Sequence, residues 1–229
     1  GIYQYEYNGY GQLIHTTSPK GHKYYSYDEF GRLYNQYEVS NDNTSIKKNI
    51  NITYNSKGLI TNKSGTSNGQ AYSSYVNYDA NGRVISSGEN SNGRYFYKKA
   101  IAYDDKGRIT SYEKGMLSSG INTKTVLENR YSNWSGEMYQ LKDKNSSKVL
   151  WELTETNAKG LVLKAKLGAS SIENTYDANN FLSNVSHTTI VNSTTNTALQ
   201  VAYSFNAIKN ELNSRATGGN FNIIEAFTY

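Results

Sequence analysis

The sequence predicts an all-β fold of tandem antiparallel β-hairpins in a curved sheet. The first observation is a turn signature, Tyr-Asp-x-x-Gly-Arg followed by an aliphatic residue, which is written almost unchanged at 27–33, 78–84 and 103–109. The second is the alternation of aromatic or apolar with polar residues before each turn, as in 76–78, which is typical of a strand with one buried face. The third is recurrence along the whole chain, which indicates a repeat architecture.

Each copy is expected to fold as a strand, a tight turn and a second strand. In the copy at 78–84, Asp79 opens the turn, because its side-chain oxygen can accept a backbone N–H two residues further on. Gly82 then takes the left-handed conformation that restarts the strand. A residue with a Cβ costs roughly 1 to 2 kcal/mol at that position. We therefore predict that Gly82→Val weakens the protein more than Gly69→Val, since only Gly82 is assigned to this position.

Degenerate copies extend the array to about nine repeats. Asn replaces Asp in two copies, Thr156 replaces the aromatic residue in a third, and Asn180 replaces the turn glycine in a fourth. Two further copies are one residue longer than the others. In chain order the copies are 7–13, 27–33, 54–60, 78–84, 103–109, 131–138, 156–162, 176–182 and 205–212.

The ends of the sequence and the polar stretches between copies complete the prediction. The chain starts inside a copy at Gly1 and finishes on Phe227-Thr228-Tyr229, which has the pattern of another incoming strand. We therefore interpret residues 1–229 as a fragment of a longer array, interrupted within a repeat at both ends. Stretches rich in Asn, Ser, Thr, Gly and Lys are expected to form the outer hairpin loops, at 39–48, 65–70, 88–93, 142–148 and 191–198.

The composition favours a thin sheet with a tyrosine-lined face. Hydrophobic residues make up 36% of the chain and the mean hydropathy is −0.73, whereas 22 residues are tyrosines that can bury a ring and keep a hydroxyl at the surface. The absence of cysteine excludes disulfides, thiolate metal sites and cysteine nucleophiles. A net charge of +5 is spread along the chain without a basic stripe, so we expect no nucleic-acid partner. No apolar run is long enough for a membrane-spanning helix.

Candidate nucleophiles and metal ligands do not form a recognisable site. Residues 65–69 match the nucleophile pattern G-x-S-x-G, but Ser67 would lie in a polar loop with no helix after it. His15 and His22 could meet across a hairpin, yet two ligands without Asp or Cys make a poor metal site. His187 is distant in sequence. We expect no catalytic, cofactor-binding or metal-binding residue, and no cofactor.

The remaining polar and aromatic candidates are also assigned to structure. Asp104 belongs to a turn and Asp105 to its exposed corner. Trp134 and Trp151 are expected to pack on the inner face rather than to serve as sugar platforms. The three arginines that follow turn glycines are expected to pair with the aspartates that open their turns, or with a neighbouring repeat: Arg32 with Asp28, Arg83 with Asp79, and Arg108 with Asp104.

The turn signature and its spacing resemble the Rhs/YD-repeat family, which includes bacterial Rhs polymorphic toxins, Tc-toxin shell proteins and teneurins. Residues 150–168 also resemble the segment that approaches the core of bacterial Rhs proteins, and 203–212 the family's Tyr-x-Tyr-Asp-x-x-Gly-Asn repeat, with Lys209 where the family has Gly. The resemblance implies YD-repeat hairpins that spiral into part of a hollow shell. The family's autoproteolytic Asp-Pro motif is absent, since Pro19 follows Ser18.

Two functions from different classes follow. The first is a non-catalytic shell segment of a secreted or surface-displayed protein, which encapsulates or presents a C-terminal toxin or other effector in interbacterial competition or host interaction. Its partners would be further repeats and the effector of the same polypeptide, and secretion machinery. The second is a carbohydrate-binding aromatic repeat array that recognises cell-surface glycans, suggested by the aromatic stretch 22–31. Such arrays usually carry more tryptophan and a tighter period.

Overall fold

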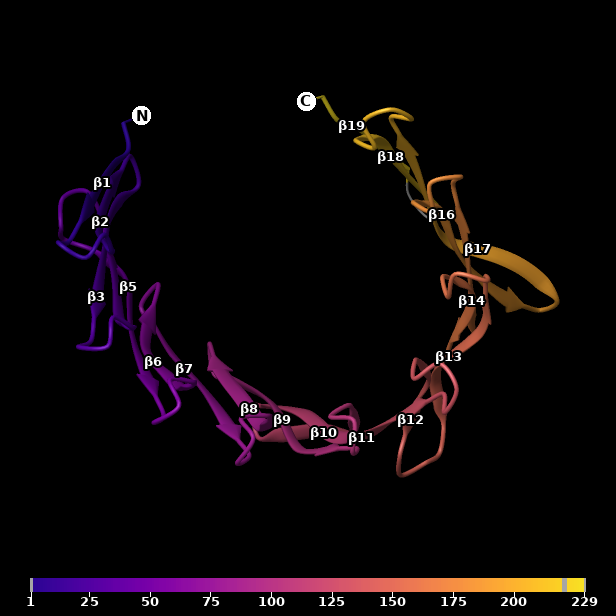
Figure 1. Ribbon diagram of the computed structural model, residues 1–229, viewed down its shortest axis with the longest axis horizontal. Helices are drawn as coiled ribbons and strands as arrows, with labels where there is room; N and C mark the ends of the chain where they lie inside the picture. The colour runs from indigo at the N-terminus through magenta and orange to yellow at the C-terminus, as the bar shows by residue number, and fades with distance from the viewer. Residues whose placement is uncertain (1, 220–221, 229) are drawn as a thin grey trace. The chain divides into compact units, whose positions relative to one another are not determined.

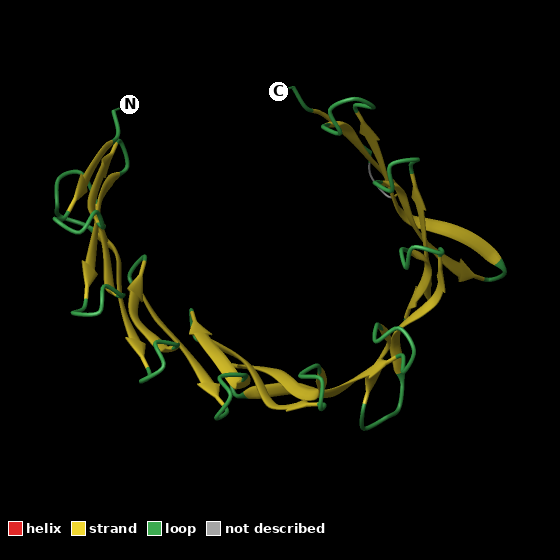
Figure 2. Ribbon diagram, viewed as in Figure 1, coloured by secondary structure: helices red, strands yellow, loops and turns green. Residues whose placement is uncertain are grey.

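The computed structural model describes residues 2–219 and 222–228, which form strands and turns and contain no helix (Figures 1 and 2). The all-β prediction is therefore confirmed. The strand expected at the end of the chain is not found at Phe227 and Thr228, because the last strand ends before them. Gly1 and Tyr229 lie outside the described residues. The chain divides into two units, Gly1–Val126 and Leu127–Tyr229.

The first unit contains ten complete strands and the beginning of an eleventh. They are β1 (Gln4–Tyr7), β2 (Leu13–Ser18), β3 (Gly21–Tyr27), β4 (Leu33–Val39), β5 (Ile46–Tyr54), β6 (Ile60–Ser67), β7 (Gln70–Tyr78), β8 (Val84–Ser91), β9 (Arg94–Tyr103), β10 (Ile109–Ser118) and β11 (Ile121–Tyr131).

The second unit contains the end of β11 and eight further strands. They are β12 (Met138–Asp143), β13 (Val149–Thr156), β14 (Val162–Leu167), β15 (Ser170–Tyr176), β16 (Leu182–Val191), β17 (Thr194–Phe205), β18 (Leu212–Gly219) and β19 (Ile223–Ala226).

The strands form antiparallel meanders, in which β1 to β10 pair in chain order, as do β11 to β19. The register shifts beside the turns. At the turn between β7 and β8, for example, Asn77 pairs with Ser86 but Tyr78 pairs with Val84, so the returning strand carries one extra residue. Such a bulge increases the local twist of the ladder and re-aims the side chains that follow it.

The core is thin, as the composition predicted. Among the described residues, few hydrophobic side chains are buried. The largest fully buried side chains are those of Leu127 and Val39. Tyr97 is also buried, at 9% exposure. The sheet is therefore held mainly by its backbone ladder and by half-buried side chains between neighbouring strands.

Most outer connections are shorter than the sequence indicated. Between β6 and β7 only Asn68 and Gly69 separate the paired residues Ser67 and Gln70. Both turn residues have positive φ, 49° and 74°, which is the pattern of a two-residue type I′ hairpin turn. Composition alone overestimates such loops, because Asn, Ser and Thr also occupy the strands on either side. The same two-residue arrangement is present at 92–93 and 192–193.

This geometry corrects the predicted contrast between two glycines. Gly69 has a φ of 74° and Gly82 a φ of 82°, so both occupy the left-handed region. The premise that only Gly82 does so is wrong, since the type I′ turn imposes the same requirement at Gly69.

Candidate functional site

The signature turns are closed by a fixed set of hydrogen bonds. In the turn that Asp79 opens, the Gly82 amide donates to the Asp79 carbonyl oxygen at 3.0 Å, and the Asp79 amide to that of Arg83 at 2.9 Å. The Asp79 carboxylate accepts from the amides of Asn81 and Arg83 at 2.9 and 2.8 Å, and from Arg83 Nε at 2.7 Å. These donors, the Arg83 amide first, hold the pKa of Asp79 below its usual value. The Asp79 carboxylate is therefore fully engaged within its own turn.

All nine expected turns are present in the described chain, and the degenerate copies keep the same closure. Where Asn55 replaces Asp, its side-chain oxygen still accepts from two backbone amides, each at 3.0 Å. Asn180 takes the left-handed position with a φ of 66°. The turns closed by an N–H to C=O hydrogen bond between their first and last residues are 8–12, 28–32, 55–59, 79–83, 104–108, 132–137, 157–161, 177–181 and 206–211.

The two longer turns are confirmed and show how an extra residue is accommodated. Gly136 and Asn210 carry the positive φ, 76° and 59°, one residue later than in a standard copy. Lys209, which stands at the family's glycine position, therefore needs no left-handed conformation. Asn206 closes this turn by donating from its amide to the Glu211 carbonyl at 2.8 Å.

In five copies the tyrosine that precedes the turn bonds to the preceding hairpin. Tyr103 donates its hydroxyl hydrogen to the carbonyl oxygen of Val84, the first strand residue after the preceding turn, at 2.6 Å. We call this contact the tyrosine staple. Four other copies make it at 2.7 to 2.9 Å: Tyr27 to Leu13, Tyr54 to Leu33, Tyr78 to Ile60, and Tyr176 to Val162.

The side chain of the residue after the turn glycine lies against the aromatic ring that precedes the next turn. The Arg83 guanidinium carbon lies 4.5 Å from the ring centroid of Tyr103, while the same side chain is held by Asp79. Arg32 lies 4.6 Å from the Tyr54 ring in the same way. In the second unit two phenylalanines replace this cation–π contact: Phe181 stacks on Phe205, with centroids 5.0 Å apart.

Both alternatives predicted for the arginines are thus found together. Arg32, Arg83 and Arg108 each form an ion pair with the aspartate that opens their turn, at 2.7 to 2.8 Å, and two of the three also contact the next repeat.

Successive turns also contact one another directly. Gln12 Nε2 donates to the Gly31 carbonyl of the next turn at 3.0 Å, and Lys57 Nζ to the Ala80 carbonyl. In the second unit, Lys159 Nζ donates to Asn180 Oδ1 at 3.0 Å. The turns therefore form a line in which polar side chains join one repeat to the next.

A tyrosine cluster lies on one face of β7–β10. Tyr75 and Tyr95 share a hydrogen bond between their hydroxyl oxygens at 2.8 Å, and the Tyr95 and Tyr97 rings stack with centroids 5.6 Å apart. Burial, followed by the hydrogen bond to Tyr75, raises the pKa of Tyr95 to about 12. The rings lie over two strand glycines: a Cβ on Gly88 would be 2.5 Å from Tyr75 Cε1, and one on Gly115 would be 2.6 Å from the Tyr97 hydroxyl. The predicted tyrosine face is therefore present here, with glycines beneath it.

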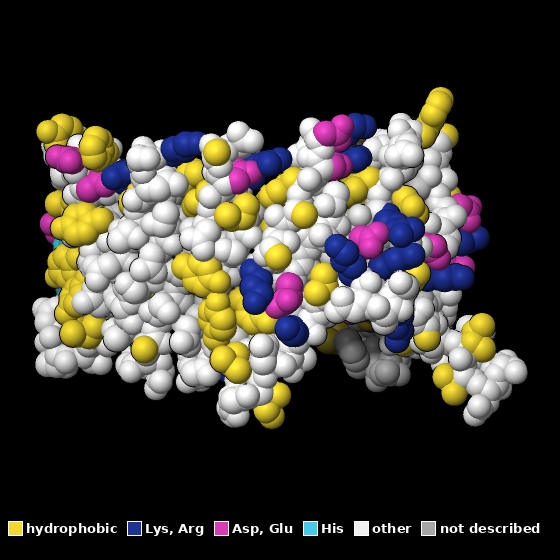
Figure 3. Space-filling view, turned by 90° about the horizontal axis from the view of Figure 1, so that it is seen from below, with side chains coloured by type: hydrophobic (Ala, Val, Ile, Leu, Met, Phe, Trp, Pro, Cys, Tyr) yellow, Lys and Arg dark blue, Asp and Glu magenta, His cyan; other side chains and the backbone are white. Residues whose placement is uncertain are grey.

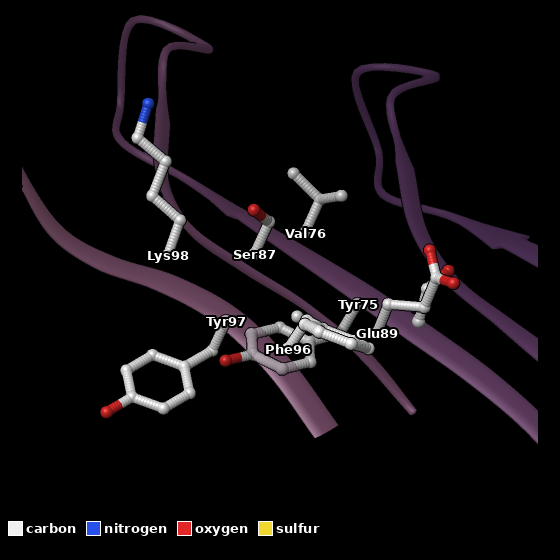
Figure 4. A pocket seen from close by; sticks show the side chains of 9 residues that line it. Tyr75, Val76, Ser87, Glu89, Phe96, Tyr97 and Lys98 are labelled. Atoms are coloured by element: carbon white, nitrogen blue, oxygen red, sulfur yellow. The ribbon is translucent and has the colours of Figure 1, made fainter. Parts of the chain in front are cut away.

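The opposite side of the same strands carries an open hollow of about 340 Å³ (Figure 4). Val76, Ser87 and Lys98 are cross-strand partners and project to one side, while Tyr75 and Tyr97 project away from that row. Burial and the neighbouring Lys114 lower the pKa of Lys98. The side chains on this face of the hollow are the Lys98 amine, the Glu89 carboxylate, the Ser74 and Ser87 hydroxyls and the apolar Val76 and Phe96.

His15 and His22 do meet, as the hairpin arrangement allowed. His15 Nε2 lies 3.1 Å from His22 Nδ1, and the other ring nitrogen of His15 lies 2.9 Å from Glu6 Oε1. The Tyr24 ring stacks on His15, with centroids 4.4 Å apart and an interplanar angle of 4°. No group of three or more His, Cys, Asp or Glu side chains arranged to hold a metal occurs in the described ranges.

The other single-residue candidates lie apart from one another. Ser67 is the last residue of β6, a strand position and not the loop that the sequence indicated. His187 lies in the middle of β16, paired with Ile172 and Leu199. Trp151 is half-buried on β13, but the inner-face packing predicted for Trp134 is wrong, because this side chain is 98% exposed. Trp134 is the third residue of turn 132–137, the corner position at which Tyr10 and Phe30 are also exposed in standard turns.

Charged side chains of both signs are interspersed. On the face drawn in Figure 3, Lys and Arg side chains lie next to Asp and Glu side chains. The described residues include no helix with the length and hydrophobicity that a membrane crossing needs.

The fold and the turns define a β-hairpin repeat protein. Residues 7–41 match the family model described as RHS Repeat, so the chain carries an RHS repeat there and the predicted resemblance to the Rhs/YD-repeat family is confirmed. No curated protein matches the chain in sequence.

The chain is also similar to two solved Tc-toxin structures. One is a crystal structure of TcdB2-TccC3-TEV, at 12% identity and a TM-score of 0.44, covering 99% of this chain and 16% of that one. The other is a Photorhabdus luminescens Tc holotoxin pore, at 12% identity and a TM-score of 0.44, covering 98% of this chain and 15% of that one. The chain thus spans about one sixth of the length of these proteins.

Proposed function

We propose that this chain is a non-catalytic wall segment of a longer Rhs/YD-repeat protein. The observation that carries the proposal is the tyrosine staple, which joins consecutive hairpins in five copies. The Asp and Arg side chains of the signature are likewise used within turns or against the next repeat. A motif whose polar groups are satisfied by its own neighbours suits a rigid wall, since few of them are left to bind or transform a substrate.

The exposed edge at β1 supports the proposal that the chain, with its nine or so repeats, is a fragment of a longer array. Tyr7 holds the staple position of the first copy, is 60% exposed and has no carbonyl partner within the described residues. Tyr5 on β1 and Tyr3 just before it are also more than half exposed. A preceding hairpin of the same kind would cover these rings and supply the carbonyl that Tyr7 lacks.

The complete protein is proposed to be secreted or displayed at the cell surface, with its wall enclosing or presenting a C-terminal toxin or other effector. The likeness of the turns to the Rhs family motivates this part of the proposal, including a role in interbacterial competition or host interaction. Cryo-electron microscopy of the full-length protein tests it. We expect a hollow wall of hairpins around additional density, and compact particles without a cavity would contradict the proposal.

Glycan binding is a second candidate, favoured by aromatic side chains at the turn corners. Trp134 is 98% exposed and Tyr10 is 93% exposed, so both rings present a free face to solvent. A glycan array probed with the chain tests this function. Binding that is lost in Trp134→Ala or Tyr10→Ala, but kept in a variant of the half-buried Trp151, would support it. Absence of binding to any glycan would leave the structural function alone.

A further inference from the structure

The histidine pair on β2 and β3 is not explained by the repeat. His15 lies on β2 opposite Tyr24, and His22 lies on β3 opposite Thr17, so the two imidazoles are diagonal neighbours on one face of the sheet. Neither residue belongs to a turn signature or makes a tyrosine staple. The pair nevertheless has a defined geometry, with Glu6 on one side and the Tyr24 ring on the other.

Glu6 determines which nitrogen of His15 is free. A carboxylate only accepts hydrogen bonds, so the 2.9 Å contact between Glu6 Oε1 and His15 Nδ1 requires the proton to be on Nδ1. His15 Nε2 then carries a lone pair that points to His22 Nδ1, 3.1 Å away. In the free protein this contact is an N–H to N hydrogen bond with His22 as the donor. Thr17 Oγ1 lies 3.4 Å from the same His22 nitrogen.

We propose that His15 and His22 chelate a late first-row divalent cation, such as Zn²⁺ or Cu²⁺, between His15 Nε2 and His22 Nδ1. Two metal–nitrogen bonds of about 2.0–2.1 Å separate their nitrogens by about 2.9 Å at a right angle and by about 3.4 Å at the tetrahedral angle. The observed 3.1 Å lies between these values. The cation lies off the line between the two nitrogens, so both rings turn until their lone pairs converge on it. Neutral His22 moves its proton from Nδ1 to Nε2, so no net proton is released when both rings are neutral.

The surroundings favour this cation class over Mg²⁺ or Ca²⁺. Imidazole suits Zn²⁺ and Cu²⁺, whereas the hard cations require several oxygen ligands. Glu6 takes the position of the carboxylate that commonly orients a metal-bound histidine through its second nitrogen. The parallel stacking of Tyr24 fixes the plane of the His15 ring. Since only two protein nitrogens converge, water would complete the coordination, which makes the site exchangeable.

Isothermal titration of the chain with ZnCl₂, and separately with CuCl₂, tests the proposal at a pH above the usual histidine pKa of about 6.5. We expect one cation per chain, with affinity falling at least about tenfold in His22→Ala and about tenfold in Glu6→Gln, which removes the orienting carboxylate. His187→Ala is the matched control, because this histidine lies on β16 in the other unit and should leave the affinity unchanged.

Circular dichroism of each variant establishes that it is folded. The Glu6→Gln variant retains both imidazoles, so its titration measures the effect of the carboxylate alone. Binding by His22→Ala with the affinity of the parent chain would overturn the proposal, as would the absence of binding by the parent chain. An equal loss of affinity in His187→Ala would also overturn it, since the cation would then bind elsewhere. In these cases the 3.1 Å contact is a hydrogen bond only.

Discussion

The Tyr103 hydroxyl donates a 2.6 Å hydrogen bond to the carbonyl oxygen of Val84. Tyr103 precedes its own turn, whereas Val84 is the first strand residue after the previous turn. The bond therefore joins two consecutive repeats beside the line of turns. Arg83 covers the Tyr103 ring, so one signature supplies the cation and the next supplies the aromatic acceptor.

Removing one staple hydroxyl should weaken the chain by the net value of one hydrogen bond. We expect Tyr103→Phe to lower the free energy of unfolding by about 1 kcal/mol, because the Val84 carbonyl loses its phenol donor while the ring and its contact with Arg83 remain. Urea denaturation measures the change. Tyr34→Phe is the control, since this ring is 46% exposed and should change stability little. Equal losses in the two variants would argue against the staple.

A β-branched residue at the turn glycine should destabilise the protein through the backbone. Gly82 has a φ of 82°, so Gly82→Val should lower the free energy of unfolding by about 1–2 kcal/mol more than Gly9→Val does. Gly9 is the control, because its φ is not positive and no atom lies within 4 Å of an added Cβ. Gly82→Asn should cost much less, because Asn180 fills the same position with a φ of 66°. Thermal unfolding ranks the variants, and a Val variant equal to the Asn variant would contradict the assignment.

The glycines beneath the tyrosine cluster should not tolerate even a methyl group. A Cβ on Gly88 would lie 2.5 Å from Tyr75 and 2.8 Å from Tyr95, so Gly88→Ala must displace both rings, at a cost of about 1–3 kcal/mol. Gly218→Ala is the matched strand control, since its Cβ would meet Asn222 Oδ1 at an ordinary 3.5 Å. Chemical denaturation compares the two. Similar stability in both variants would mean that the rings do not press on the sheet.

The turn carboxylates should make stability depend on acid pH. The Arg83 amide and side chain, against the opposing effect of burial, lower the pKa of Asp79 from its usual 3.8. A lowered pKa in the folded state gives stability that is present above pH 3.8 and is lost as the pH falls through the lower folded value. Melting temperatures from pH 6 down to 2 should therefore fall less in Asp79→Asn than in the parent chain. Parallel curves would refute the linkage.

The strands and turns could be predicted because their causes are local. Asp or Asn accepts the turn amides and Gly or Asn takes the positive φ, so even the copy with Asn180 was identifiable. Loop length was less predictable. A type I′ turn needs only two residues, and the Asn- and Ser-rich residues around Asn68 are as typical of a loop as of the strands that they form.

The contacts between repeats depend on register, which no local pattern reveals. The staple between Tyr103 and Val84 joins residues 19 positions apart, at the end of β9 and the start of β8, so it depends on how these two strands pair. The exposure of Trp134 was missed for a different reason. Trp134 is the third residue of its turn, the corner at which Tyr10 is also exposed, and a tryptophan was assigned to the inner face by its residue type instead of by this position.

The most direct test of the account is hydrogen–deuterium exchange of Tyr78→Phe against the parent chain. Tyr78 donates to the Ile60 carbonyl at 2.8 Å, so removing its hydroxyl should speed exchange in turns 55–59 and 79–83 and in the first residues of β6. Exchange in β3 and β4, two hairpins away, should stay unchanged. Unchanged exchange at the two turns, or a uniform increase along the chain, would contradict the claim that the signature tyrosine holds consecutive hairpins together.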